Sequence, residues 1–221
     1  MSKAQKFDVD DAYALKTPAD SIRLYAEWAD TYESEFVEIE GYVAYLRAAE
    51  QLLLQRASIS GAVLDVGCGT GIVGAVLREG GIGIMDGIDI SQPMLAEAGK
   101  KQTGSGSPVY RKLINADLTK KLDIPDKQYA GLISAGTFTH GHLGPEPLDE
   151  LWRVAESGAW CAIAVRSTHF ESMHFGEKLS ADVAKGTIAK PEFVEIDMYT
   201  ANTRNLEHAK DKALVIVCQV M

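Results

Sequence analysis

The sequence lacks the long apolar stretches that mark membrane and secreted proteins. No segment of its 221 residues approaches the ~20 consecutive apolar residues that a membrane-spanning helix needs. Residues 1–15 are polar and lack the apolar segment of a secretory signal. We therefore expect a cytoplasmic protein without a membrane partner.

Cysteine is also scarce. Cys68, Cys161 and Cys218 are odd in number, far apart in sequence and set in apolar or glycine-rich runs. This pattern predicts reduced, buried thiols and argues against a disulfide framework. No group of cysteines and histidines has the spacing of a zinc site, so we predict no metal.

Basic residues are outnumbered by acidic ones. The chain has 22 Lys and Arg against 31 Asp and Glu, giving a formal net charge of −9. Proteins that bind double-stranded nucleic acid carry basic surfaces, and no run of Lys and Arg here exceeds two residues. Nucleic acid is therefore disfavoured as a partner, and a small neutral or cationic substrate fits better.

The pattern along the chain predicts an α/β fold. The composition, 46% hydrophobic and 24% charged, is that of a globular protein of one domain. After residue 60, short apolar runs alternate with helical segments, as in a mostly parallel sheet. The expected strands are residues 62–66, 84–88, 109–113, 129–134, 159–165, 193–200 and 213–220, the last two forming an antiparallel pair. Residues 1–60 are expected to form a helical lid packed on a core of residues 61–221.

A glycine-rich turn follows the first of these strands and is the strongest signal in the sequence. Gly67, Gly69 and Gly71 lead from the strand into a helix, where backbone can approach a nucleoside closely. A dinucleotide fingerprint would need a third glycine at the position of Ile72. The spacing thus disfavours a nicotinamide-dependent oxidoreductase. Asp65, at the end of the strand, could instead attract the ammonium group of a ligand that carries both an amino group and a sulfonium.

Two further carboxylates end the next two strands. Asp89 could accept both ribose hydroxyls of an adenosine ligand, and Asp117 could accept from the adenine amine. Each also has a purely structural interpretation. Asp89 could complement a helix dipole, and Asp117 could be a solvated turn residue.

These segments, 65–71, 89–95 and 116–118, together resemble class I S-adenosylmethionine-dependent methyltransferases. Residues 133–142 resemble in addition the methyltransferase-like subfamily typified by the Williams–Beuren-region methyltransferase. The resemblance covers roughly residues 20–165. It implies a Rossmann-like, seven-stranded, mostly parallel sheet with an antiparallel final strand, helices on both faces and the cofactor across the carboxyl ends of the strands.

The resemblance also implies roles for individual residues. Gly67, Gly69 and Gly71 would surround the methionine part of S-adenosylmethionine, Asp89 its ribose, and Met94 its adenine. Neighbouring motif members that would complete the cofactor site are Cys68, Ile90, Ser91, Ala116, Asp117, Leu118, Ser134, Ala135 and Gly136. Tyr25, Trp28 and Tyr32 match the aromatic residues of an N-terminal helix that covers the cofactor, although their spacing equally fits core packing.

The expected activity is methyl transfer to a small molecule by in-line displacement. His140 and His142, on a glycine-flanked loop, are the candidate bases for an acceptor that must lose a proton. The segment 134–137 departs from the Asn/Asp-Pro-Pro-aromatic motif that many amine methyltransferases carry after the fourth strand, which argues against nucleic-acid or amide-nitrogen methylation of that type. A protein methyltransferase and a non-catalytic S-adenosylmethionine-binding protein stay open as alternatives, as do a monomer and a homodimer.

Overall fold

A computed structural model describes residues 11, 12, 14, 15, 17–201, 203 and 206–221 of the protein. The first ten residues of the expected lid therefore lie outside the described residues. None of the described helices is long and apolar enough to cross a membrane.

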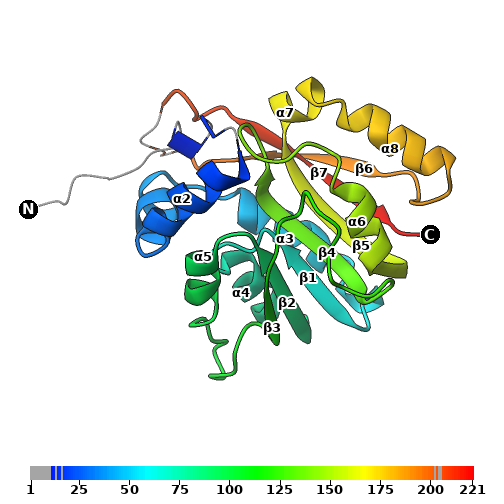
Figure 1. The fold of residues 1–221 in the computed structure, drawn as a ribbon, viewed down its shortest axis with the longest axis horizontal. Coiled ribbons are helices and arrows are strands. Elements are labelled where there is room, and N and C mark those ends of the chain that lie inside the picture. The colour runs from blue at the N-terminus through cyan, green and yellow to red at the C-terminus, as the bar shows by residue number, and fades with distance from the viewer. Residues whose placement is uncertain (1–10, 13, 16, 202, 204–205) are drawn as a thin grey trace, which may run out of the picture.

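A seven-stranded sheet forms the centre of the molecule (Figure 1). Its strands are β1 (Ala62–Val66), β2 (Ile84–Asp89), β3 (Lys112–Asn115), β4 (Tyr129–Phe138), β5 (Ala155–Arg166), β6 (Glu192–Asp197) and β7 (Lys212–Gln219). Their order is β3-β2-β1-β4-β5-β7-β6. Only β7 runs antiparallel to its neighbours, so the mostly parallel sheet with an antiparallel final strand is confirmed.

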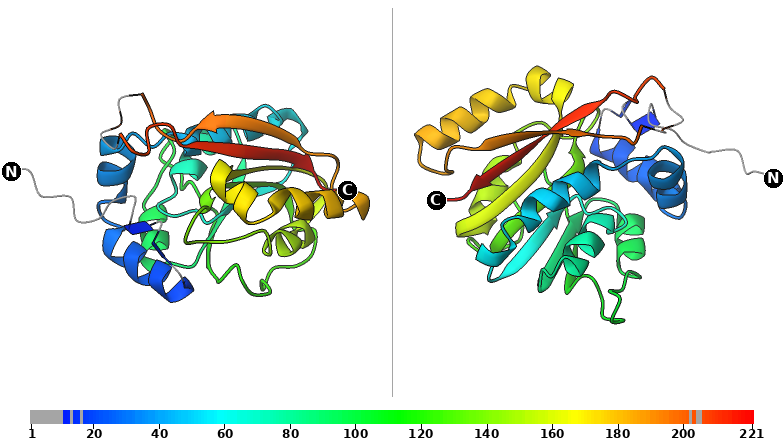
Figure 2. Two further views of the ribbon diagram at one scale, coloured as in Figure 1. Left: turned by 90° about the horizontal axis from the view of Figure 1, so that it is seen from above. Right: turned by 180° about the vertical axis from the view of Figure 1, so that it is seen from behind.

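Helices cover both faces of the sheet (Figure 2). One layer holds α3 (Ala44–Leu53), α4 (Ile72–Glu79) and α5 (Gln92–Ala98), and the other holds α6 (Leu148–Val154), α7 (Ser167–Ser172) and α8 (Phe175–Ala184). β1 is buried along its whole length because successive side chains enter the two opposite cores.

The amino-terminal segment lies over the carboxyl ends of the strands, beside α5 (Figure 1). It consists of α2 (Pro18–Trp28), capped by Thr17 through a reciprocal bond with Asp20, and the π-helix η1 (Glu33–Ile39). Its carboxyl end is tied to the core, since the backbone N–H groups of Val43 and Thr200 donate to the carbonyl groups of Met198 and Gly41. A short 3₁₀ turn, η2 (Arg56–Ser58), follows α3.

Four strand predictions needed correction. The third strand lies at Lys112–Asn115 and not at 109–113, because the Tyr110 side chain turns into the core beneath the glycine turn. β4 continues to Phe138, and β5 begins at Ala155. β6 ends at Asp197 and not at residue 200, and it lies at the edge of the sheet because β7 pairs with β5.

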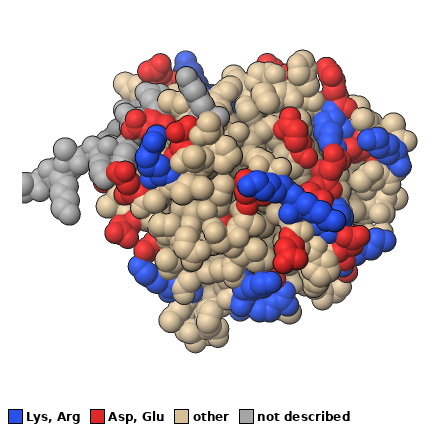
Figure 3. Space-filling model, viewed as in Figure 1, with Lys and Arg blue, Asp and Glu red and all other residues tan. Residues whose placement is uncertain are grey.

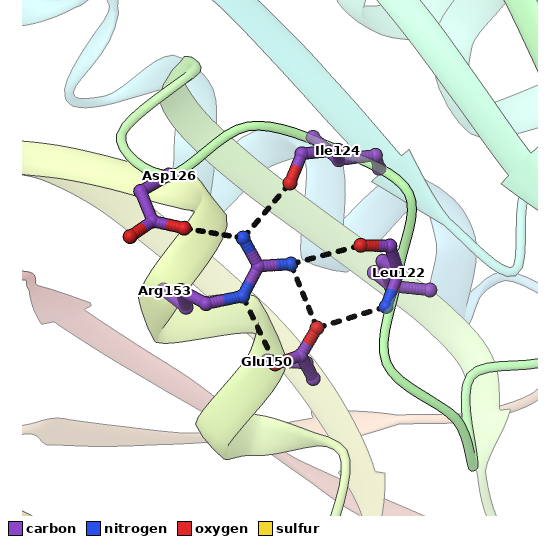
Figure 4. Close-up of polar contacts among 5 residues, drawn as sticks. All are labelled: Leu122, Ile124, Asp126, Glu150 and Arg153. Carbon is purple, nitrogen blue, oxygen red and sulfur yellow. Dashed lines mark hydrogen bonds and ion pairs between the residues drawn. The ribbon is translucent and has the colours of Figure 1, made fainter.

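Arg153 of α6 holds the loop between β3 and β4 (Figure 4). Its guanidinium donates to the carbonyl oxygens of Leu122 and Ile124 and to the carboxylates of Asp126 and Glu150. Glu150 also accepts from the backbone N–H of Leu122 at 2.9 Å. The loop that carries Asp117 toward the strand ends is therefore fixed at its far side by three bonds that Arg153 donates and by a fourth that Glu150 accepts.

Acidic and basic side chains lie intermixed on the face shown in Figure 3. The described part of that face has no continuous basic surface, in keeping with the net charge of −9.

Candidate functional site

A cavity of about 180 Å³ lies where the carboxyl ends of β1, β2 and β4 meet the amino-terminal helix α2. Parallel strands end at a common edge, and the loops that leave them there form the usual ligand site of such sheets. The described lining consists of Thr17, Pro18, Ser21, Tyr25, Tyr32, Gly67, Gly69, Asp89, Ile90, Met94, Asp117, Leu118, Thr119, Ala135, Gly136, Thr137, Gly141, His142 and Leu143.

An irregularity in β4 packs against the glycine turn at the edge of this cavity. Between Ser134 and Phe138 the pairing with β5 shifts register, which pushes the intervening residues outward. The hydroxyl groups of Ser134 and Thr137 both donate to the carbonyl of Val66, at 2.8 and 3.1 Å. A side chain at Gly67 would collide with Thr137, since an added Cβ would stand 1.9 Å from its hydroxyl oxygen.

Asp89 connects the turn with the second strand. Its carboxylate accepts from the backbone N–H of Gly69 at 2.9 Å and from that of Ser91 at 2.8 Å. Burial raises the pKa of Asp89, while these backbone bonds oppose that rise. The carboxylate therefore reaches the cavity already oriented by main-chain groups.

The wall beyond Asp89 is mostly apolar. Met94 and Leu118 are almost fully buried and line the cavity together with Ile90. At its rim, Asp117 accepts from the backbone N–H and hydroxyl of Thr119 at 2.9 and 2.6 Å. Burial raises the pKa of Asp117, but the hydrogen bonds from Thr119 and the nearby Lys120 together outweigh that effect, so the pKa is lowered.

Asp65 lies outside the lining. It is fully buried beneath the glycine turn, where it accepts from the hydroxyl of Tyr110 at 2.6 Å while its other oxygen has no hydrogen-bond partner. Burial raises its pKa to about 7. Gly71 and Gly74 make room for the Tyr110 side chain. A Cβ added at Gly71 would stand 2.8 Å from that side chain, and one added at Gly74 would stand 2.2 Å from it.

Tyr25 and His142 form a hydrogen-bonded pair inside the cavity. The Tyr25 hydroxyl lies 2.9 Å from Nε2 of His142, and Nδ1 of His142 lies 3.0 Å from the carbonyl oxygen of His140. A carbonyl only accepts, so Nδ1 carries the proton and Nε2 accepts from Tyr25. Burial lowers the pKa of His142, which favours this neutral form near pH 7.

His140 lies outside the lining, with its Nε2 2.8 Å from the hydroxyl of Thr168 and its ring against His169. His169 itself donates to the carbonyl of Leu143 at 2.9 Å. The two histidines proposed from sequence as bases are therefore separated by the fold, and only His142 faces the cavity.

The predicted cofactor residues divide in the same way. Those that line the cavity are Tyr25, Tyr32, Gly67, Gly69, Asp89, Ile90, Met94, Asp117, Leu118, Ala135 and Gly136. Those outside the lining are Trp28, Asp65, Cys68, Gly71, Ser91, Ala116 and Ser134. Several of the second group support the first, as Ser134 does through the carbonyl of Val66.

Trp28 belongs to a smaller cavity that adjoins the first. This aromatic chamber, of about 30 Å³, is lined by Ala12, Tyr25, Trp28, Tyr32, Phe36, Tyr42, Gly136, Thr139, His142 and Met198. Tyr25, Tyr32, Gly136 and His142 line both cavities, so the chamber opens beside the Tyr25–His142 pair.

Sequence reasoning missed several lining residues. These are Thr17, Pro18, Ser21, Thr119, Thr137, Gly141 and Leu143. Thr137 and Gly141 lie inside the segment 133–142 that carries the subfamily resemblance, but the irregularity in β4 that contains Thr137 leaves no periodic pattern in the sequence. Thr17 could have been found as the helix cap that begins α2.

Comparisons with known proteins agree with this architecture. Residues 63–158 match the family described as "Methyltransferase domain". Methyltransferase-like protein 27 of Homo sapiens is 27% identical over 173 residues, which cover 77% of this chain and 67% of that protein.

Two solved structures are similar in fold. A chain of the complex between the Haloferax volcanii Trm112 methyltransferase activator and a methyltransferase is 18% identical, with a TM-score of 0.62 and coverage of 92% of this chain and 97% of that one. The cyclase SpnF is 15% identical, with a TM-score of 0.62 and coverage of 93% and 97%. At these identities the likeness concerns the fold alone, which supports more than one chemistry.

Proposed function

We propose that this protein, a class I S-adenosylmethionine-dependent methyltransferase by its domain and fold, methylates a small molecule. The observation that carries the proposal is the juxtaposition of Asp89, the glycine turn and the Tyr25–His142 pair around one cavity. A protein that only binds the cofactor needs the first two, but the partly buried, neutral histidine beside them suits a reaction.

The cavity fits S-adenosylmethionine. Gly69 faces open space, since an added Cβ would meet nothing within 4 Å, so a ligand can approach its backbone. Asp89 would hold the ribose, Met94 and Leu118 the adenine, and Gly67 and Gly69 the methionine part. When bound, the cofactor supplies an activated methyl group together with its own leaving group.

The chain's own contribution is alignment and proton removal. Tyr25 and His142 lie where the main cavity meets the aromatic chamber, which is where we place the acceptor. An acceptor proton would pass to the Tyr25 oxygen as the Tyr25 proton passes to Nε2 of His142. His142 can accept it because Nδ1 already donates to the carbonyl of His140.

The enclosed form of the site favours a small acceptor over a protein side chain. Helix α2 covers the strand ends and lines the cavity with Pro18, Ser21 and Tyr25. We accordingly propose that residues 1–60 act as a lid on the core of residues 61–221. Membership in the Williams–Beuren-region subfamily is part of the same proposal, and the similarity to methyltransferase-like protein 27 supports it.

The first test is a thermal-shift comparison of S-adenosylmethionine, S-adenosylhomocysteine and NAD. A ligand that binds only the native state raises the midpoint of unfolding by mass action. A rise with the two adenosyl ligands and none with NAD is expected. Folded protein that responds to neither adenosyl ligand would contradict the proposal. In a separate assay with S-adenosylmethionine that carries a labelled methyl group, transfer of the label to proteins but to no small molecule would favour a protein methyltransferase.

A further inference from the structure

The aromatic chamber is lined by aromatic rings that pack against one another. Trp28, Tyr32 and Phe36 follow one another at four-residue spacing through α2 and η1, and Tyr42 completes the row. Their ring centroids are 5.2 Å apart from Trp28 to Tyr32 and from Tyr32 to Phe36, and 4.8 Å from Phe36 to Tyr42. Rings packed at these distances constrain one another, so the chamber is formed before any ligand enters.

The charge around the chamber favours a cation. No Lys or Arg is found among the described residues that line either cavity. Glu35 accepts from the indole N–H of Trp28 at 3.0 Å, which places a carboxylate at the edge of that ring. Aromatic faces attract cations through their electron-rich surfaces, and a carboxylate bonded to the N–H strengthens that attraction.

A polar atom in the chamber also lacks a partner. The hydroxyl oxygen of Thr139 is buried and has no hydrogen-bond partner, although Thr139 lines the chamber. Buried hydroxyl groups are nearly always hydrogen-bonded, so this one is available to a ligand donor. A space of about 30 Å³ admits a small head group, while the rest of an acceptor would extend into the main cavity.

We propose that the aromatic chamber receives the protonated amino group of the acceptor, so that the enzyme is an amine N-methyltransferase. This rests on the proposed methyltransferase function. The ammonium group donates to Thr139 and loses one proton, which passes through Tyr25 to His142. The nitrogen lone pair forms the new N–C bond, and the C–S bond breaks with its electron pair going to sulfur.

The test compares acceptors that differ only in the head group. 2-Phenylethylammonium, 2-phenylethanol and 3-phenylpropionate are titrated calorimetrically into the full-length protein saturated with S-adenosylhomocysteine. We expect the ammonium to bind at least ~10-fold more tightly than the alcohol and the carboxylate to bind most weakly. Equal affinities, tighter carboxylate binding or no binding at all would overturn the amine proposal.

Matched variants of Tyr32 separate ring electrostatics from packing. Tyr32→Leu keeps apolar volume but removes the ring face, and should lower the ammonium-to-alcohol ratio ~3- to 10-fold. Tyr32→Phe keeps the face and should keep the ratio. A ratio that Tyr32→Leu leaves unchanged in folded protein would also overturn the proposal.

The cofactor step is measured separately. If S-adenosylhomocysteine itself fails to bind, the proposed function is wrong, whereas binding of S-adenosylhomocysteine with no ammonium preference removes only the amine inference. Mass spectrometry of the product after turnover with S-adenosylmethionine should show methyl on nitrogen. An O-methylated product from the alcohol, with the amine unreacted, would overturn the assignment.

Discussion

Replacing Asp65 with Asn should stabilise the protein, and the effect should grow with pH. Asp65 is fully buried, one of its oxygens has no partner, and burial raises its pKa to about 7 from an ordinary value of 3.8. A raised acid pKa means that the folded state holds the proton more tightly than the unfolded state does. The free energy of unfolding therefore falls as pH rises from about 4 to about 7, and this cost persists above pH 7.

The structure sets the size of the effect. A difference of one pKa unit corresponds to about 1.4 kcal/mol, so the cost of ionising Asp65 has an upper limit on the order of 4 kcal/mol at pH 8. Asn keeps an acceptor for the Tyr110 hydroxyl, which now bonds Asp65 at 2.6 Å, and carries no charge. We expect Asp65→Asn to match the parent near pH 4 and to exceed it by one to several kcal/mol, up to about that limit, at pH 8.

Urea unfolding followed by tryptophan fluorescence at pH 4, 6 and 8 measures this difference, since other titrating groups largely cancel between the two proteins. Asp86→Asn is the matched control. Asp86 is equally buried but accepts from Arg111 at 2.9 and 2.6 Å and from Tyr129 at 3.0 Å, so its replacement should destabilise by about 1–3 kcal/mol. An Asp65→Asn variant whose stability relative to the parent is the same at all three pH values would refute the reasoning.

Four further outcomes are expected. Asp89→Ala should weaken S-adenosylhomocysteine binding by about 1.5–3 kcal/mol in calorimetry, because the carboxylate is proposed to bond the ribose, and an unchanged Kd would remove that role. His142→Asn should lower kcat by roughly 10²- to 10⁴-fold with cofactor affinity retained, whereas His140→Asn should stay near the parent, and the reverse ranking would contradict the assignment. Because burial lowers the pKa of His142, the rise of kcat/KM with pH should have its midpoint below about pH 6.5, and a rise centred above pH 7 would exclude His142 as the base. Arg153→Met should lower the free energy of unfolding by about 2 kcal/mol in urea, since it leaves the Leu122 and Ile124 carbonyls and two carboxylates without their donor, and a loss below about 0.5 kcal/mol would show that the loop is held by other contacts.

Local patterns were enough to predict the part of the site that is built locally. The strand at 62–66, the glycine turn and the helix beginning at Ile72 are contiguous, and each is specified by apolar runs and by residues that permit unusual backbone angles. Asp89 was predictable for the same reason, because it ends a short apolar strand whose partners share one edge of the sheet. The seven-stranded, mostly parallel sheet with an antiparallel final strand followed from the resemblance that these motifs carry, whereas the order of the strands came from the structure.

Other features could not be predicted from any short stretch of the sequence. The third strand begins later than predicted because the Tyr110 side chain fills a space beside Gly71 and Gly74. These glycines lie up to 39 residues earlier in the chain. Cys161 and Cys218 are distant in sequence yet lie opposite each other on β5 and β7. Such contacts depend on which strands become neighbours, and the hydrophobic periodicity of the sequence does not specify the pairing of strands.

The sequence by itself determined the α/β class, the glycine turn and the row of carboxylates at the strand ends, since each depends on nearest neighbours along the chain. Only the tertiary structure decided that His142 faces the cavity while His140 turns to Thr168, two residues that have the same local chemistry. Only it joined Tyr25 to His142 across 117 positions and gathered the aromatic rings beside them. The physical reason is that a hydrogen bond or a ring contact needs both partners in place, and the fold, not the local sequence, brings them within reach.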